Sequence, residues 1–366
     1  MSGTSLDGVD AVLAREGEDG WRTEAGLTRP FPADLQRRLR LLCEEERVPL
    51  DEVLRLDGEL AEEYAAAVAA LRRHHPLPPG AIAAIGSHGQ TIRHRPELGN
   101  SWQIGHPALL AERSGLPVVA DFRRADLAAG GQGAPLAPLF HRALLWRGEA
   151  QLVVINIGGM ANVSLIDSQG SRGFDSGPGN ALMDAWTQAH WHKPWDDGGH
   201  IAASGRVHPG LLQDLLQHPF FSRPPPKSTG REEFHLEWLR QRLTHHPTID
   251  PADVQATLCE LTAQSIATAV KVWSKEGAPV LVCGGGVHNA TLMNRLTQLL
   301  APRPVHDTRE RGIDPDHLEA LGFAWLAAMR LCGMPLDTGP VTGAQHPVVL
   351  GAVYSPPSQP RSAGGT

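Results

Sequence analysis

Asp175 is the residue whose setting most clearly suggests chemistry. It lies in the stretch Phe174–Asn180, which reads FDSGPGN and is expected to form a rigid turn. Shortly before it, the apolar strand Leu152–Ile155 leads into the pair Gly158-Gly159. A strand that stops in glycines can bring backbone N–H groups close to a phosphate, and a carboxylate on a rigid turn can act as a general base. Together the two stretches predict a phosphate-handling enzyme with Asp175 at its chemical centre.

Two other glycine turns could receive a phosphate or a flat ring. Gly3–Gly8 encloses Thr4 and Ser5, whose hydroxyls can donate hydrogen bonds, although a plain hairpin turn explains these residues equally well. Gly284–Gly286 follow the buried strand Val280–Cys283 and come just before a helix. Strand, glycines and helix in this order leave room for a ligand against bare backbone.

Polar side chains follow two predicted strands in the first half. Ser87–His94 come directly after the short strand Ile82–Gly86, as in a polar-ligand pocket at the carboxyl end of a strand, although a structural turn also fits. Asp121 and Arg123 follow the predicted strand over 117–120, and we expect them on the same side of an extended segment.

Further acidic residues occur late in the chain. Glu319 belongs to a helix predicted within Ile313–Trp325, on a different face from the apolar core residues, and is free for solvent or a site. Asp196-Asp197 stand in a turn, and metal binding by this pair is the less favoured interpretation. No His-Glu-x-x-His motif or His/Cys cluster occurs, so no metal-ligating residues are predicted.

Composition narrows the class of protein. The 366 residues suggest roughly two domains of about 150 residues each. Hydrophobic residues make up 41%, enough for real cores, and a net charge of −7 argues against nucleic-acid binding. The four cysteines have no metal-ligand spacing, so we expect reduced thiols. Neither a signal peptide nor a membrane-spanning run is visible, so we expect a cytoplasmic enzyme without membrane contact.

The elements that must position these residues repeat along the chain. Each half opens with a strand, a turn of small residues and a returning strand, which suggests duplicated α/β domains facing a shared nucleotide. The glycine-rich stretch 128–136 is either a mobile crossing between the halves or a loop shaped around a ligand. We therefore expect domain I at 1–134 and domain II at 135–334. A segment at about 335–356 returns to domain I, and 357–366 forms a flexible tail.

Amphipathic helices complete the predicted framework. One begins at Pro32-Ala33-Asp34, and a second carries apolar residues at helical spacing from Val53 to Leu71. A longer helix covers 258–273. Their apolar stripes are expected to form core rather than a site.

Taken together, the motifs resemble those of the anhydro-N-acetylmuramic acid kinase family. In the family's order they are MSGTSLDGVD, IGSHGQTIRH, QIGHPALLAERSGLPVVADFRRADLAAGGQGAPL, INIGGMANVS, GFDSGPGNALMDAW, PKSTGRE and VCGGGVHN. Each motif alone is weakly specific, but the set is highly specific and covers nearly the whole chain. The resemblance implies two related actin-like (ribonuclease H-like) α/β domains around a nucleotide cleft.

The resemblance also implies an activity. Family members use ATP and Mg²⁺ to open 1,6-anhydro-N-acetylmuramic acid hydrolytically and phosphorylate O6. The products are N-acetylmuramic acid 6-phosphate and ADP, in peptidoglycan recycling. A homodimer is implied as well.

Family motifs assign roles to individual residues. The catalytic carboxylate falls on Asp175, and Glu319 is the second acidic candidate, for sugar contact or water placement. The residues expected to bind ATP are Ser2, Gly3, Thr4, Ser5, Leu6, Asp7, Gly8, Gly158, Gly159 and Asn162, with Gly284, Gly285 and Gly286 on the adenosine side. The residues expected to bind the sugar are Gln90, Thr91, Arg93, Gln103, Asp121, Arg123, Gly177 and Asn180. Arginine suits the lactyl carboxylate.

Three other functions stay open. They are a related sugar or acetate kinase without ring opening, a non-catalytic nucleotide-binding module, and a plain glycosidase. A glycosidase would need a second close carboxylate and no ATP. Asp121 competes with Asp175 as the base, because related sugar kinases often carry theirs at such a strand end.

Family members carry an apolar strand before the MSGTSLDG turn, whereas the sequence given begins at Met1 of that turn. We expect an added upstream segment to raise stability and activity.

Overall fold

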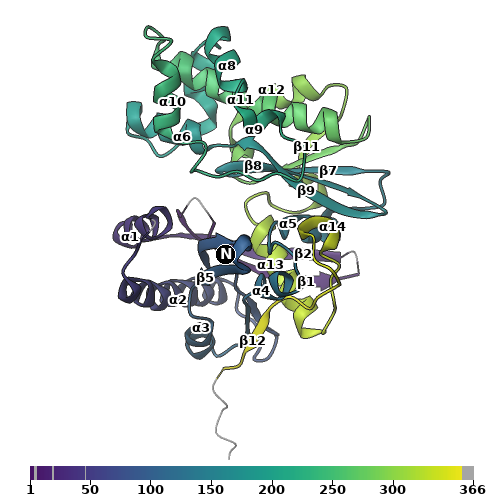
Figure 1. Ribbon diagram of the computed structural model, residues 1–366. Coiled ribbons are helices and arrows are strands. Elements are labelled where there is room, and N and C mark those ends of the chain that lie inside the picture. The colour runs from purple at the N-terminus through teal and green to yellow at the C-terminus, as the bar shows by residue number, and fades with distance from the viewer. Residues whose placement is uncertain (4–5, 19, 46, 357–366) are drawn as a thin grey trace, which may run out of the picture. The chain divides into compact units, whose positions relative to one another are not determined.

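The computed structural model describes residues 1–3, 6–18, 20–45 and 47–356. The chain divides into two compact units (Figure 1). Unit 1 comprises Met1–Phe140 and the chain from Glu319 onward, and unit 2 comprises His141–Leu318. Helices and strands occur in both units, which confirms the expected α/β class.

The strands of unit 1 form small separate sheets. β1 (Gly8–Gly17) and β2 (Gly20–Pro30) make an antiparallel hairpin. β3 (Ile85–Gly86) runs parallel to β6 (Val118–Ala120), which pairs antiparallel with β12 (Ala352–Tyr354). β4 (Gln90–Arg95) and β5 (Asn100–Ile104) form another antiparallel pair. The expected strand over Ile82–Gly86 is therefore shorter than predicted.

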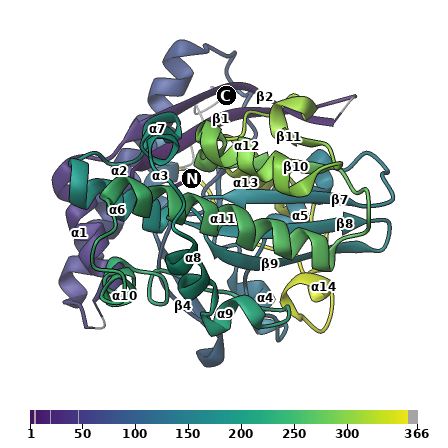
Figure 2. The same cartoon turned by 90° about the horizontal axis from the view of Figure 1, so that it is seen from above.

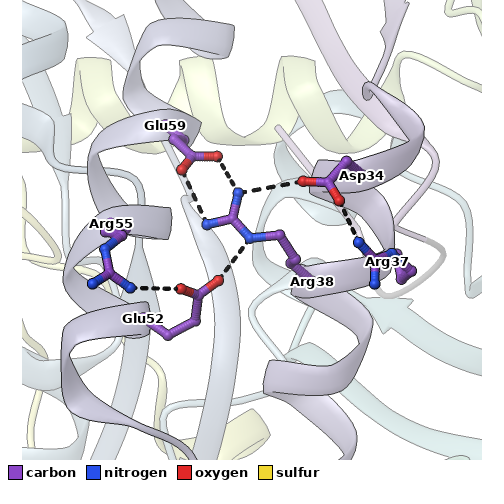
Figure 3. A network of polar contacts seen from close by, with 6 residues as sticks. All are labelled: Asp34, Arg37, Arg38, Glu52, Arg55 and Glu59. Atoms are coloured by element: carbon purple, nitrogen blue, oxygen red, sulfur yellow. Dashed lines mark hydrogen bonds and ion pairs between the residues drawn. The ribbon is translucent and has the colours of Figure 1, made fainter.

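Two helices of unit 1 follow the predicted apolar spacing. α1 (Ala33–Glu44) buries Leu35, Leu39 and Leu42, and α2 (Leu50–His74) buries Val53, Leu56, Leu60 and Leu71. Figure 3 shows Arg38 of α1 between Glu52 and Glu59 of α2, at 2.7 and 2.8 Å. Asp34 and Arg37 pair beside this network. Such surface ion pairs are worth about 1 kcal/mol or less each, so the apolar contacts carry most of the packing. The remaining helices of this unit are α3 (Pro107–Ser114), α4 (Arg124–Ala128), α13 (Leu318–Leu331) and α14 (Gly339–Thr342), with the 3₁₀ turn η1 (Pro96–Leu98).

Residues of two of the unit 1 sheets line a cavity of about 350 Å³. Its lining includes Val9–Glu16 of β1 on one side and Ala81–Ser87 around β3 on the other. Met1 lies at its edge and exchanges two backbone hydrogen bonds with Asp10, each 2.8 Å long. Met1 thus forms an antiparallel bridge to β1. Burial lowers the pKa of its α-amino group to about 6.

The core of unit 2 is one mixed sheet with strand order β11-β10-β7-β8-β9 in the described residues. β7 (Leu152–Ile157), β8 (Met160–Asp167) and β9 (Gly170–Pro178) form an antiparallel meander. β10 (Val280–Cys283) lies parallel to β7, and β11 (Val305–Asp307) parallel to β10. Val280–Cys283 are buried throughout, as a central parallel strand requires.

One long helix organises the packing of unit 2. α11 (Pro251–Trp273) contacts β8 and β9, and Figure 2 shows it lying across the sheet. Apolar residues such as Leu258 and Ile266 join Phe174 and Val163 in one core. The other helices are α6 (Ala181–Trp191), α7 (His200–Ser204), α8 (Pro209–Leu216), α9 (Pro219–Ser222), α10 (Leu236–Leu243) and α12 (Ala290–Leu300), with η2 (Asp197–Gly199), η3 (Gly285–His288) and η4 (Thr308–Arg311).

The unit boundaries differ from the expected positions after 134 and at about 335. The first boundary falls inside α5 (Ala137–Leu145), because the glycine stretch before it is tied into unit 1. Gln132 N–H donates to the Thr342 carbonyl at 3.0 Å, and Gly133 N–H donates to Asp126 Oδ2 at 2.6 Å. The second boundary falls where α13 begins, since Phe323 packs on Phe122 with ring centroids 5.4 Å apart.

Candidate active site

Asp175 lies in strand β9 and not in a turn, which corrects the sequence expectation. In the strand register Asp175 lies opposite Asn162 of β8, and Asn162 lies opposite Asn156 of β7. Cross-strand partners share a face of the sheet, so the three polar side chains form one row. The adjacent Phe174 points into the apolar core. Strand alternation therefore presents Asp175 on the face away from that core.

A distant loop fixes the Asp175 carboxylate. Asp175 N–H donates to the Lys227 carbonyl at 3.0 Å. In return, Thr229 N–H donates to Asp175 Oδ2 at 2.9 Å. The Thr229 hydroxyl donates to Glu233 Oε2 at 2.7 Å, which holds the loop itself. One carboxylate oxygen of Asp175 is thus committed to the backbone of this loop.

The setting of Asp175 makes it a stronger base than an ordinary aspartate. Burial raises its pKa to about 6, and the Glu232 charge acts in the same direction. The Thr229 N–H and the Lys227 ammonium oppose that rise. A carboxylate with a pKa near neutrality can take a proton and release it again at physiological pH.

The Gly158-Gly159 turn is packed against the start of α6. Gly179 N–H donates to the Gly159 carbonyl at 2.9 Å, and Asn180 N–H to the Gly158 carbonyl at 2.8 Å. A Cβ at Gly179 would lie 2.3 Å from the Gly158 carbonyl oxygen, so only glycine fits there. Gly177 has a φ of +150°, which also requires glycine. Gly179 and Asn180 therefore support the glycine turn directly through their backbone N–H groups.

The second glycine turn of unit 2 meets the same strand end. A Cβ at Gly284 would lie 2.4 Å from Asn156 Oδ1, and one at Gly286 would lie 2.4 Å from the Ile157 side chain. A Cβ at Gly285 would meet no described atom closer than 3.9 Å, and one at Gly158 none closer than 3.8 Å. Within unit 2, both predicted nucleotide turns thus lie at the end of β7, and a Cβ at Gly158 or Gly285 would meet only an ordinary van der Waals contact.

The N-terminal turn is described only in part, and the candidates Thr4 and Ser5 lie outside the described residues. Ser2 is buried and its hydroxyl lies 2.7 Å from the Tyr64 hydroxyl. Leu6 has a φ of +57° and packs into the unit 1 core. The Asp7 carbonyl accepts from Phe31 N–H at 3.0 Å. A Cβ at Gly8 would lie 2.4 Å from the Arg29 carbonyl oxygen, and Gly3 accepts from Leu6 N–H at 3.3 Å.

Two sugar-binding candidates of unit 1 lie side by side on β4 and β5. Thr91 lies opposite Gln103, and Gln103 Nε2 donates to Thr91 Oγ1 at 3.0 Å. Gln90 is buried and its Oε1 has no hydrogen-bond partner in the described residues. Arg93 instead donates to the Leu42 carbonyl at 2.7 Å, at the end of α1. Capping of the C-terminal end of α1 explains the orientation of the Arg93 side chain, and no bound ligand is needed to explain it.

Asp121 and Arg123 do not share an extended segment, contrary to the sequence expectation. Asp121 has a φ of +58°, and Arg123 is already helical in φ and ψ as the residue that precedes α4. Asp121 Oδ2 lies 3.6 Å from Arg124, and burial raises the Asp121 pKa. Arg123 is turned instead toward His88, whose Nε2 lies 2.9 Å from its Nη2.

Glu319 lies in the first turn of α13 and is half-buried. Burial raises its pKa, and the Asp10 charge adds to that rise. The Arg123 charge and the α-amino group act in the opposite direction. Glu319 therefore belongs to a cluster of ionisable groups within unit 1.

Sequence reasoning missed several residues that the structure brings to these clusters. Asn156 and Thr229 lie within the motifs INIGGMANVS and PKSTGRE, but no role is predicted for them, because only strand register and a long-range loop contact relate them to Asp175. His88 lies within the predicted polar run Ser87–His94, but its partner Arg123 is 35 residues further along the chain. In the described residues no group of three or more His, Cys, Asp or Glu side chains could hold a metal ion. Both oxygens of Asp196 accept from backbone N–H groups of α7.

Comparison with known proteins gives a consistent family. A family model described as anhydro-N-acetylmuramic acid kinase matches residues 1–356. A protein of that name from Xanthomonas oryzae pv. oryzae is 49% identical over 361 residues, which cover 97% of this chain and 96% of the relative. One from Chromohalobacter salexigens is 49% identical and covers 97% of this chain and 98% of the relative. One from Pseudomonas syringae pv. tomato is 48% identical and covers 97% of each chain.

Solved structures give more distant likenesses. The activator of 2-hydroxyisocaproyl-CoA dehydratase from Clostridium difficile is 10% identical with a TM-score of 0.47, and covers 90% of this chain and 96% of its own. ROK hexokinase from Thermus thermophilus is 17% identical with a TM-score of 0.33, and covers 87% and 99%. Among the described residues, no helix has the length and apolar character needed to cross a membrane.

By the family model and the relatives at nearly half identity, the chain belongs to the anhydro-N-acetylmuramic acid kinase family.

Proposed function

We propose that this protein opens 1,6-anhydro-N-acetylmuramic acid hydrolytically and transfers a phosphoryl group from ATP to O6. The products are N-acetylmuramic acid 6-phosphate and ADP, and the setting is cell-wall recycling. The observation that carries the mechanism is the half-buried Asp175 carboxylate, with a pKa of about 6 and one oxygen fixed by Thr229 N–H. Membership of the family supports the choice of substrate.

Asp175 serves as the general base for the attacking water. The water oxygen bonds to the anomeric carbon, its proton passes to Asp175, and the bond from that carbon to O6 breaks. The freed O6 carries developing negative charge and attacks the γ-phosphorus of ATP, from which ADP leaves. The proton on Asp175 then returns to solvent. Because the phosphoryl group captures O6, the reaction needs no separate acid of the kind that a glycosidase uses.

The glycine turns of unit 2 fit a nucleotide. Gly158 and Gly285 are loosely packed, with no atom closer than 3.8 Å to a Cβ placed there, while Gly179, Gly284 and Gly286 are tightly packed and hold the turns in shape. Open backbone N–H groups suit phosphate oxygens. ATP supplies the phosphoryl group. We assign Mg²⁺ to the nucleotide phosphates and water, since no acidic cluster of the described residues would hold it.

Side chains of unit 1 fit the sugar. Thr91 and Gln103 form an adjacent polar pair for sugar hydroxyl or acetamide groups. Arg123 suits the lactyl carboxylate. Glu319 remains the second acidic candidate, for sugar contact or water placement, and Asp121 a further sugar ligand. A homodimer and a cytoplasmic location remain predictions.

A coupled assay tests the proposed function. Purified protein, ATP, Mg²⁺ and 1,6-anhydro-N-acetylmuramic acid should release ADP, and mass spectrometry should detect the ring-opened 6-phosphate. ADP release with N-acetylmuramic acid but not with the anhydro sugar would instead identify a kinase without ring opening. No ADP release with either sugar would contradict kinase activity on both.

A further inference from the structure

Arg123 is a half-buried cation that forms no ion pair with a carboxylate of the described residues. Its Nη1 donates to the Gly133 carbonyl at 2.7 Å, and its Nη2 lies 2.9 Å from His88 Nε2. Its Nε is buried and has no hydrogen-bond partner in the described residues. The nearby Asp121 carboxylate contacts Arg124 instead, at 3.6 Å.

The nearby acids do not neutralise this charge by contact. Asp126 Oδ2 accepts from Gly133 N–H at 2.6 Å, and its Oδ1 accepts from the Thr342 hydroxyl at 2.7 Å. The Glu319 and Asp126 charges act on Arg123 through space, and no described ion pair joins either of them to the guanidinium. Arg123 is therefore held mainly by neutral acceptors.

His88 is the side chain that fixes the guanidinium. It is only 7% exposed, and its ring centroid lies 4.6 Å from that of Phe323. Burial lowers its pKa well below the usual value, and the Arg123 charge adds to this. The imidazole is thus neutral, and its Nε2 lone pair can accept from Arg123. That contact assigns the ring proton to Nδ1, which is buried without a partner in the described residues.

We propose that His88 is a positioning residue that makes the enzyme selective for a sugar bearing a carboxylate. Its neutral imidazole orients Arg123 without cancelling the positive charge, and that charge binds the lactyl carboxylate of the substrate. A carboxylate at position 88 would pair with Arg123 and consume the charge. This inference rests on the proposed function, because it concerns the sugar of the same reaction. An anionic ligand at Arg123 could also be a nucleotide phosphate, so the test must separate the two.

Two substitutions differ only in charge at the contacting atom. His88→Gln places a neutral oxygen near the position of Nε2, and His88→Glu places a charged one there. Each variant is assayed with 1,6-anhydro-N-acetylmuramic acid and with 1,6-anhydro-N-acetylglucosamine, which lacks the lactyl group. Binding of both sugars is also measured by calorimetry without ATP. His141→Gln serves as a control, because His141 is another buried histidine, 2.9 Å from Ser164 Oγ in unit 2.

We expect His88→Gln and the control to keep the wild-type preference between the sugars. His88→Glu should weaken binding and raise KM for the carboxylated sugar by about tenfold or more, the usual scale for a lost charged hydrogen bond. Its affinity for the lactyl-free sugar and its KM for ATP should not change. Equal losses for both sugars, or a rise in KM for ATP alone, would overturn the proposal.

Two further measurements separate a failure of the His88 proposal from misfolding and from a failure of the proposed function. If His88→Glu does not fold, Arg123→Gln should show the same selective loss, and an unchanged preference there would overturn the proposal. If wild type binds the carboxylated sugar selectively but consumes no ATP, the proposed function fails while the role of His88 stands.

Discussion

Thr229 N–H donates to Asp175 Oδ2 at 2.9 Å across a sequence separation of 54 residues. This bond orients the carboxylate on β9 and occupies one of its oxygens. In the proposed mechanism, the other oxygen takes the proton from water. The same bond lowers the Asp175 pKa against a larger rise from burial, and the balance places that pKa at about 6.

The pH dependence of turnover should report this carboxylate. Asp175 must be ionised to accept a proton, so kcat/KM should fall about tenfold per pH unit below pH 6. Glu232→Gln should move this acid limb to lower pH, because the Glu232 charge helps to raise the Asp175 pKa. Glu237→Gln, on the exposed side of α10, is the control and should leave the limb in place. A limb near pH 4 in wild type would contradict the assignment.

The same carboxylate should make the native protein less stable at neutral pH. The native pKa of about 6 exceeds the reference value of 3.8, so the native state binds more protons between these values and stability falls as pH rises through them. Asp175→Asn has no charge to bury and should be more stable at pH 7, by up to about 3 kcal/mol. The difference should vanish below about pH 4. Urea unfolding at both pH values measures it, and equal gains at pH 3.5 and 7 would exclude ionisation as the cause.

Gly179 should tolerate no side chain. A Cβ there would lie 2.3 Å from the Gly158 carbonyl oxygen, so Gly179→Ala must displace the glycine turn. We expect a loss of about 1–3 kcal/mol in stability and a raised KM for ATP. Gly58→Ala is the matched control, since its Cβ would meet nothing within 4 Å on helix α2, and it should gain about 0.5–1 kcal/mol. Unchanged unfolding and ATP kinetics in Gly179→Ala would show that the turn can relax.

The cavity between β1 and β3 should accept an added strand. Met1 already pairs with Asp10, so residues joined to its amino group would continue antiparallel along β1 toward Val12. About five apolar residues added there should fill the cavity and convert the buried amine into a peptide N–H. We expect a higher Tm and higher turnover than for an extension of glycine and serine with equal length. Identical Tm and turnover for the two extensions would refute this expectation.

The glycine turns and the main helices could be predicted from local sequence, whereas the contacts around Asp175 could not. Gly158-Gly159 follow a continuous apolar run, and α1 and α2 carry regular apolar stripes. β9 contains few strand-forming residues, so Asp175 was expected in a turn; pairing with β8 decides its conformation. The Thr229 and His88 contacts join residues far apart in sequence, and no local pattern encodes them. Arg93 is predicted as a sugar ligand from its motif, and its contact with the Leu42 carbonyl at the end of α1 could not be predicted locally, because the two residues are 51 positions apart.

The most direct test is ATP consumption with 1,6-anhydro-N-acetylmuramic acid by wild type and Asp175→Asn, with both proteins shown to be folded. Asn keeps the shape of the side chain but cannot take the proton. We expect wild type to form the 6-phosphate and the variant to lose about a hundred- to ten-thousandfold in kcat, the usual range for a removed general base. Near wild-type turnover in the variant would contradict the assignment of Asp175 as the base.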